Sequence, residues 1–129
     1  MNFWKVYFII FWLFVSQVVN SQIKVACIGN SITYGYGLPS PLSQSYPAKL
    51  QELLGSSYEV SNFGISGRTM LINGNLPYWI EPEYAQALNL NPDVVFIMLG
   101  TNDAKLNLNW IPYKDEFLES LLHYFLVIR

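Results

Sequence analysis

The sequence has 129 residues, of which 52% are hydrophobic and 12% charged, and a formal net charge of −2. This length allows one domain. The 7 Lys and Arg residues are scattered singly among 9 Asp and Glu residues, so the sequence predicts no nucleic-acid partner. One cysteine and one histidine allow neither an internal disulfide nor zinc-ligand spacing, and we expect no metal and no other cofactor.

Residues 1–21 are typical of a secretory signal peptide. Lys5 precedes an unbroken apolar run of 10 residues, 6–15, and small or β-branched residues follow at 19–21. A retained membrane anchor is the less favoured alternative, because a spanning helix needs about 20 apolar residues. We therefore predict a secreted or periplasmic protein, with no stable membrane insertion after cleavage, whose single domain comprises residues 22–129.

The first half of that domain begins with a strand and a helix. Residues 23–28 predict a short apolar strand that contains Cys27, for which we expect a buried, inert thiol. A loop rich in Gly, Pro and Ser spans residues 33–45. Residues 47–54 predict a helix, because a proline suits its first turn and a glycine follows its last. The apolar face predicted for this helix comprises Ala48, Leu50, Leu53 and Leu54.

The second half continues the alternation. Residues 58–63 predict a strand, 67–78 a loop and 81–88 a short helix. Residues 94–99 predict a third strand that is apolar on both faces, which is typical of a central parallel strand covered by helices on both sides. Residues 113–128 predict a final helix. The core positions predicted for it are Phe117, Leu118, Leu121, Leu122 and Phe125.

Strands that alternate with helices predict a doubly wound parallel α/β sheet with right-handed crossovers. Ligands bind such sheets beyond the carboxyl ends of the strands. Each predicted strand is followed by glycine and polar residues: Gly29-Asn30-Ser31, Gly64-Ile65-Ser66 and Gly100-Thr101-Asn102-Asp103. Because the carboxyl ends of parallel strands share one edge of the sheet, we expect these three segments to form the functional site.

The residue types at this edge suit acyl transfer. Ser31 follows a buried strand, so the scaffold holds it while its hydroxyl stays accessible. Neighbouring glycines let backbone N–H groups approach a carbonyl, and Asn102 offers a neutral side-chain donor; one such oxyanion donor is worth about 3–4 kcal/mol. A serine hydroxyl also needs a base. The only histidine, His123, is expected on the solvated face of the final helix rather than in the site.

The three segments resemble, in order, the first three conserved blocks of the SGNH (GDSL-like) hydrolases. Residues 29–35, Gly-Asn-Ser-Ile-Thr-Tyr-Gly, resemble the block that carries the nucleophile, and this role falls to Ser31. Residues 62–69, Asn-Phe-Gly-Ile-Ser-Gly-Arg-Thr, resemble the second block, whose glycine, here Gly64, donates a backbone N–H to the oxyanion. Gly-Thr-Asn-Asp at 100–103 resembles the third block, whose asparagine, Asn102, donates from its side chain.

The resemblance implies a flavodoxin-like, three-layer α/β/α fold with a parallel sheet of about five strands, doubly wound. It also implies a serine esterase. Because secretion would place the protein among extracellular glycans, the favoured function is carbohydrate O-acetylesterase activity on a small-molecule or glycan acyl ester. The alternatives are a lipase-like or lysophospholipase-like esterase, and a non-catalytic remnant or glycan-binding module.

The sequence departs from the family pattern in two ways. Asn30 stands where the first block often has Asp, which we interpret as a tolerated variant. The Asp-x-x-His block, which supplies the base and its orienting acid, occurs nowhere in the 129 residues. We therefore expect a C-terminally truncated domain, without the last two strands and the final helix, whose third strand is an exposed apolar edge. Such a chain alone is expected to hydrolyse p-nitrophenyl acetate no faster than its Ser31→Ala variant.

Several of these residues also have structural interpretations. Ser31 alone could be a helix N-cap. Ser66 is a rival nucleophile, but it lacks the G-x-S-x-G spacing. Gly35 and Gly37 lack the G-x-G-x-x-G spacing of a dinucleotide loop. Asp103 could cap or turn the chain after the third strand. The aromatic candidates for an acyl or sugar pocket, which pack in cores at least as often, are Tyr34, Tyr36, Trp79 and Trp110.

Overall fold

The computed structural model describes residues 21–106 and 114–127. Trp110 and the predicted signal segment, apart from Ser21, therefore lie outside the described residues. Within these ranges no helix is long and apolar enough to span a membrane. The elements, in chain order, are β1 (Ile23–Gly29), α2 (Ser31–Tyr34), α3 (Pro41–Gln44), α4 (Tyr46–Leu54), the 3-10 turn η1 (Gly55–Ser57), β2 (Tyr58–Gly64), the 3-10 turn η2 (Tyr78–Ile80), α5 (Pro82–Asn89), β3 (Val94–Met98), α6 (Thr101–Leu106) and α7 (Lys114–Val127).

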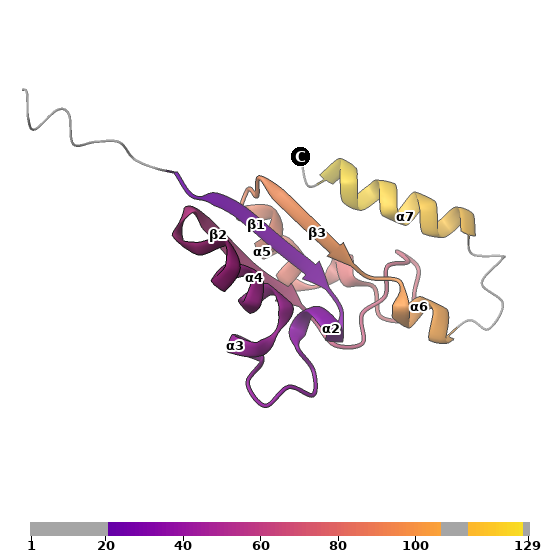
Figure 1. Cartoon of the computed structure of the whole chain (residues 1–129). Coiled ribbons are helices and arrows are strands. Elements are labelled where there is room, and N and C mark those ends of the chain that lie inside the picture. Colours follow the sequence, from indigo (N-terminus) through magenta and orange to yellow (C-terminus); the bar gives the residue numbers. More distant parts are fainter. Residues whose placement is uncertain (1–20, 107–113, 128–129) are drawn as a thin grey trace, which may run out of the picture.

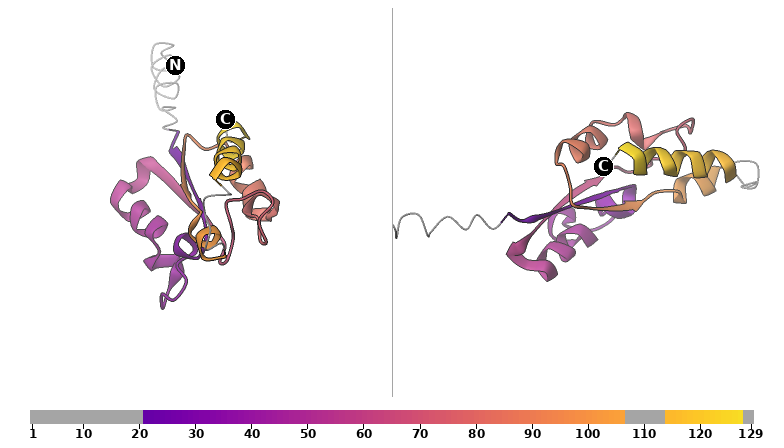
Figure 2. Two further views of the ribbon diagram at one scale, coloured as in Figure 1. Left: turned by 90° about the vertical axis from the view of Figure 1, so that its right-hand side faces the viewer. Right: turned by 90° about the horizontal axis from the view of Figure 1, so that it is seen from above.

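The three strands form one parallel sheet in the order β2-β1-β3. Helices α3 and α4 cover one face, and α5 and α7 cover the other, so the sheet is the middle of three layers (Figures 1 and 2). The predicted doubly wound α/β class is confirmed. In this order the chain reverses its direction of winding between β1 and β3, the position at which ligands bind such sheets.

The main core lies between the sheet and the α5–α7 layer. Ala26 and Ile28 of β1 point into it and are fully buried. The rings of Tyr78, Tyr84 and Tyr124 meet there, and those of Tyr84 and Tyr124 pack edge to face with centroids 5.4 Å apart. This geometry favours aromatic pairs beyond the area that they bury. The aromatic cluster thus joins α7 to the rest of the domain.

Some of the core positions predicted for the helices α7 and α4 are wrong. In α7, Phe117 and Leu121 pack against the core as predicted, but Leu118 and Leu122 are 48% and 58% exposed. The buried side chains next to that pair are Ser120 and Tyr124. Phe125 is among the positions whose side chains lie outside the described residues. In α4, Leu53 is 85% exposed, whereas Ala48, Leu50 and Leu54 are partly buried.

The predicted loop at 33–45 contains the end of the single-turn helix α2 and all of the single-turn helix α3, and the sequence does not predict α6. All three are short, and none has enough residues to show an apolar periodicity. Gly100 has a φ of +100°, which allows the turn from β3 into α6. These short helices are what position the candidate site, because α2 and α6 begin directly beyond the tips of β1 and β3.

Strand β3 is parallel, as predicted, but it lies at the edge of the sheet and is covered on one face only. Val95 and Ile97 pack into the core. On the opposite face Val94, Phe96 and Met98 are 41%, 46% and 40% exposed. The prediction of an exposed apolar edge strand is confirmed, and the prediction of helices over both of its faces is wrong for the described residues.

The other edge strand, β2, is protected by side chains. The amide of Gln51 donates from Nε2 to the carbonyl of Tyr58 at 3.0 Å, and its Oε1 accepts from the N–H of Val60 at 2.7 Å. One side chain thereby fills the place of a neighbouring strand, a common way to blunt an edge.

Candidate active site

The three sequence-predicted site residues lie at the tips of neighbouring strands. Ser31 is the first residue of α2, directly after β1, and is partly buried. Gly64 is the last residue of β2. Asn102 is the second residue of α6, beyond β3, and is also partly buried. The fold therefore places all three at the carboxyl edge of the sheet.

Hydrogen bonds join the three tips to one another. The N–H of Ile65, after β2, donates to the carbonyl of Gly29 in β1 at 3.0 Å. Asn30 Nδ2 donates to Thr101 Oγ1 at 3.3 Å, which connects the tips of β1 and β3. Asn102 Nδ2 donates to the carbonyl of Arg68 at 2.9 Å, which connects the tip of β3 to the segment after β2. The segments are thus parts of one rigid arrangement.

Asn30 holds the turn that presents Ser31. Its side chain is 1% exposed, and its Oδ1 caps α2 by accepting the N–H of Ile32 at 3.0 Å. Its Nδ2 donates a hydrogen bond to the hydroxyl oxygen of Thr101. An aspartate could keep the same cap and accept a hydrogen bond from Thr101, because a hydroxyl is both donor and acceptor. This geometry explains how Asn30 can replace the Asp that is common in the first block.

Gly64 is required by the close approach of α2 to the end of β2. A Cβ built on Gly64 would fall on the backbone nitrogen of Tyr34 and lie 2.6 Å from the carbonyl carbon of Thr33. Neither backbone atom can move without shifting the helix that begins with Ser31. The glycine therefore sets the distance between the nucleophile-bearing turn and β2.

The N–H of Gly64 is already occupied in this structure. It donates to Oδ1 of Asn62 at 2.9 Å. The same Asn62 side chain donates from Nδ2 to the carbonyl of Thr33 at 2.8 Å and to Ser45 Oγ at 3.4 Å. Asn62 thus ties β2 to α2 and to the start of α4. Its amide was not singled out from the sequence, although it lies within the residues that resemble the second block.

Asp103 has a supporting role that the sequence did not reveal. Its carboxylate is 1% exposed and accepts the N–H groups of Met70 and Leu71, each at 2.9 Å. The prediction that Asp103 caps or turns its own segment is replaced by this contact with a distant segment. Together with the bond from Asn102 to Arg68, it fixes the segment after β2 against α6.

A base for Ser31 is not evident in the described part of the chain, where no hydrogen bond involves Ser31 Oγ. His123 lies on α7 and is partly buried, with its ring centroid 6.1 Å from that of Trp79 and 6.0 Å from that of Tyr124. It packs among aromatic rings instead of standing free in solvent as expected. Ser66 is exposed in the turn after β2.

Cys27 is the buried, inert thiol that the sequence predicts. It is fully buried in β1, and burial raises its pKa to about 11. At neutral pH the thiol is therefore protonated and a poor nucleophile. Burial also raises the pKa of Tyr46 to about 12. The Tyr46 hydroxyl lies 3.3 Å from that of Thr33 beneath α2, so this layer is a neutral, hydrogen-bonded support for the turn.

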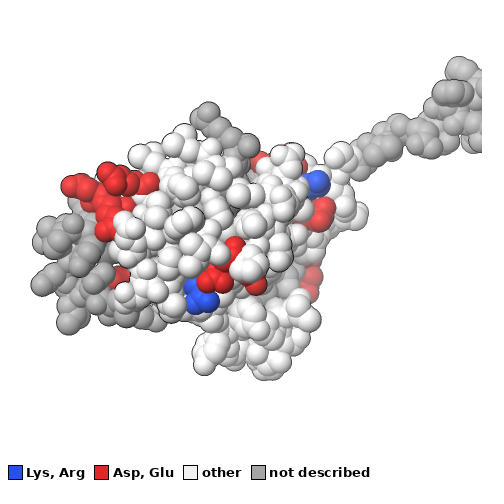
Figure 3. All heavy atoms as spheres, turned by 180° about the vertical axis from the view of Figure 1, so that it is seen from behind, with Lys and Arg blue, Asp and Glu red and all other residues white. Residues whose placement is uncertain are grey.

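Charged groups are sparse around the fold. On the face shown in Figure 3, the few basic atoms lie apart from one another, each beside acidic atoms. Arg68 Nε and Glu81 Oε1 form a partly buried ion pair at 2.6 Å. Among the residues that the structure describes, no three His, Cys, Asp or Glu side chains gather as metal ligands. The chemistry at the strand tips thus depends on hydroxyl, amide and backbone groups.

Comparisons with known proteins identify the family of this chain. The family model for GDSL-like lipases and acylhydrolases matches residues 27–124. An acetylxylan esterase from Xylanibacter ruminicola is 52% identical over 99 residues, which cover 77% of this chain and 20% of that protein. This chain therefore spans about a fifth of the curated relative that it matches.

Two solved structures have a similar fold. Both are of AlinE4, an SGNH-hydrolase family esterase, one of them a mutant; each has a TM-score of 0.54 and 23% identity, covering 80% of this chain and 52% of the other. At that identity the likeness shows the fold alone. Fold and strand-tip motifs together define a doubly wound α/β protein of the SGNH type. The chain belongs to the GDSL-like lipase/acylhydrolase family.

Proposed function

We propose that this chain carries the nucleophile side of a serine esterase that removes acetyl groups from carbohydrate. The observation that supports this most directly is the set of hydrogen bonds that joins the tips bearing Ser31, Gly64 and Asn102. Family membership supports ester hydrolysis, and the relative named as an acetylxylan esterase supports an acetylated glycan as substrate. The substrate class is thus a small-molecule or glycan acyl ester.

In this proposal Ser31 Oγ attacks the acetyl carbonyl carbon, and the carbonyl oxygen becomes an oxyanion. Asn102 Nδ2 has two hydrogens, of which one is bonded to the carbonyl of Arg68, so the second serves the oxyanion. The N–H of Gly64 exchanges Asn62 Oδ1 for the oxyanion. This exchange is favourable because a charged acceptor forms the stronger hydrogen bond.

The proton of Ser31 passes to a general base, which returns it to the departing sugar oxygen as the C–O bond breaks. Water then attacks the acetyl-enzyme: the same base takes a proton from the water and returns it to Ser31 Oγ as acetate leaves. The family resemblance assigns this role to an Asp-x-x-His block, a motif that does not occur within the 129 residues. His123 is disfavoured because it packs against Trp79 and Tyr124.

We further propose that the protein is secreted or periplasmic and that residues 1–21 are removed as a signal peptide. The basis is the sequence of that segment, where Lys5 precedes a short apolar run. Export would bring the site to extracellular glycans. Mass spectrometry of the mature protein tests this: an N-terminus at Gln22 supports cleavage, and an intact Met1 contradicts it.

The function is tested by comparing rates on p-nitrophenyl acetate and p-nitrophenyl decanoate with the full-length gene product. We expect kcat/KM to favour acetate by at least about tenfold, and Ser31→Ala to remove the activity. Ser66→Ala is the matched serine control and should retain the activity. Faster hydrolysis of decanoate would replace the proposal by a lipase-like function, and equal rates for the Ser31→Ala variant would refute Ser31 as nucleophile.

A further inference from the structure

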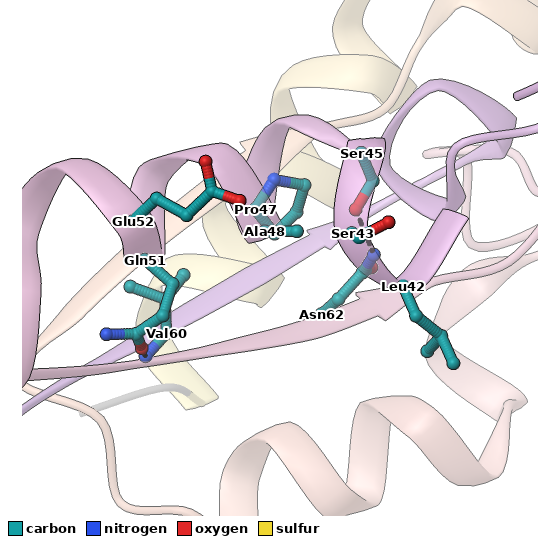
Figure 4. Close-up of a pocket in the computed structure, with 9 residues that line it drawn as sticks. All are labelled: Leu42, Ser43, Ser45, Pro47, Ala48, Gln51, Glu52, Val60 and Asn62. Carbon is teal, nitrogen blue, oxygen red and sulfur yellow. Dashed lines mark hydrogen bonds between the residues drawn. The ribbon is translucent and has the colours of Figure 1, made fainter. Parts of the chain in front are cut away.

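A groove runs along the outer edge of β2, beginning at the strand tip that carries Gly64. It consists of two adjoining hollows that share Leu42 and Asn62. The larger hollow, of about 580 Å³, lies between α2, α3, α5 and the end of β2. The smaller, of about 350 Å³, follows β2 between α3 and α4, with Leu42 and Asn62 toward one end and Gln51 and Val60 toward the other (Figure 4). Both volumes lie within the usual range of ligand sites.

The groove reaches α2, the helical turn that begins with the candidate nucleophile Ser31. Tyr34, which lines the larger hollow, is the last residue of the helical turn that begins with Ser31. Gly64 lines the same hollow from the opposite element. A ligand in the groove would therefore extend to the edge at which the acyl group is proposed to react. The β2 residues that line the groove run from Val60 to Gly64, a rise of about 13 Å, which is enough for two or three sugar units.

The side chains that line the groove suit a neutral, hydroxyl-rich ligand. Tyr34 is 48% exposed, so part of its ring is open to a ligand. Gln86 supplies an amide, and Glu83 supplies a carboxylate that can accept hydrogen bonds from hydroxyl groups. Of the described residues that line either hollow, none is Lys or Arg. This lining offers no counter-charge to a phosphate or uronate.

We propose that this groove binds the unbranched, neutral pyranose chain that carries the ester, with one sugar ring against the face of Tyr34. The inference rests on the proposed function, because it assigns the groove to the leaving group of that reaction. The apolar face of a sugar ring packs on the aromatic ring, while its hydroxyls bond to Gln86 and Glu83. The site is distinct from the acyl-binding end, which lies with Ser31 and Asn102.

The test is the binding of unacetylated xylohexaose to the full-length gene product carrying Ser31→Ala, measured by isothermal titration calorimetry. Because this ligand has no ester and the variant has no nucleophile, binding is separated from catalysis. We expect saturable binding that weakens about tenfold on adding Tyr34→Ala, about what the loss of one aromatic contact causes. Adding Gln86→Ala should weaken it severalfold, whereas Tyr34→Phe should preserve it.

Asn89→Ala is the matched control, because Asn89 lies on α5 with Gln86 but is exposed outside the groove. It should leave the affinity unchanged, and circular dichroism should show every variant folded. Absence of xylohexaose binding, equal affinity of Tyr34→Ala, or binding of decanoate in competition with the sugar would overturn the groove assignment. If the groove assignment fails but the protein still hydrolyses acetyl esters, the proposed function stands. If the protein binds the sugar but does not hydrolyse acetyl esters, the groove assignment stands and the proposed function fails.

Discussion

Asn30 and Thr101 are joined by a hydrogen bond of 3.3 Å from Nδ2 to Oγ1, across the position where the sheet reverses its winding. The same Asn30 side chain caps the helix that starts with Ser31. One buried amide therefore fixes the nucleophile-bearing turn to the segment that carries Asn102. The contact explains why the first block can contain Asn in place of Asp.

Substitution of Asn30 tests this explanation. Asn30→Asp should change the free energy of unfolding by less than about 1 kcal/mol, since the cap remains and Thr101 becomes the donor. Asn30→Ala removes the cap and should cost about 1–2 kcal/mol. Urea unfolding followed by circular dichroism measures both. If Asn30→Asp is as unstable as Asn30→Ala, the hydroxyl of Thr101 does not adapt as described.

Gly64→Ala should be strongly destabilising, because the new Cβ would meet the backbone of Thr33 and Tyr34. Overpacking of this kind costs about 1–3 kcal/mol, and here the helix that begins with Ser31 must move. The matched control is Gly37→Ala. Gly37 has a φ of +84°, and no other atom lies within 4 Å of the place that an added Cβ would take, so only about 1 kcal/mol of backbone strain is expected. Equal losses of stability in Gly64→Ala and Gly37→Ala would show that the close approach of α2 to β2 does not require a glycine at position 64.

Asp103→Ala should loosen the segment after β2. It leaves the buried N–H groups of Met70 and Leu71 without their acceptor, at a cost of about 1–3 kcal/mol for each group. Asp103→Asn keeps one acceptor oxygen and should lose about half as much. Amide hydrogen exchange at the two positions, together with urea unfolding, measures the effect. The exposed Asp115 provides the control, and Asp115→Ala should cost less than about 1 kcal/mol. Unchanged exchange at Met70 and Leu71 in Asp103→Ala would contradict this role.

The open face of β3 should make the 129-residue chain prone to self-association. Phe96 is 46% exposed, and Val94 and Met98 beside it are similarly open. Phe96→Thr should therefore reduce light scattering at a given concentration with little change in unfolding. Ile97→Thr, on the packed face of the same strand, should instead lower stability by about 1–3 kcal/mol. Scattering that is the same for Phe96→Thr and the unmodified chain would show that association uses another surface.

The sequence predicts the three strands well because residues 23–28 and 94–99 are short apolar segments, residues 58–63 alternate, and a glycine follows each. It does not predict the short helix α6, since Thr-Asn-Asp-Ala-Lys-Leu shows no apolar period. In α7 apolar residues occur nearly all round the helix, so the inward face could not be chosen, and the core positions predicted at Leu118 and Leu122 are wrong. The apolar pattern alone does not show which side of α7 packs against the sheet.

The same distinction applies to the site. Ser31, Gly64 and Asn102 could be proposed because each follows a strand within a recognisable motif. The contacts of Asp103 with Met70 and Leu71 join residues more than 30 positions apart, and no local pattern indicates them. The occupation of the Gly64 N–H by Asn62 is likewise a property of the folded turn. Supporting contacts of this kind become visible only in the structure.

The most direct test of Ser31 as the nucleophile is to label the full-length gene product with a fluorophosphonate, which reacts with activated serines, and to locate the adduct by peptide mass spectrometry. We predict one adduct, on Ser31, that is lost in Ser31→Ala and slowed by an acetylated xylo-oligosaccharide. An adduct on Ser66, or ester hydrolysis that continues at full rate after Ser31 has been labelled, would contradict the assignment of Ser31 as the nucleophile.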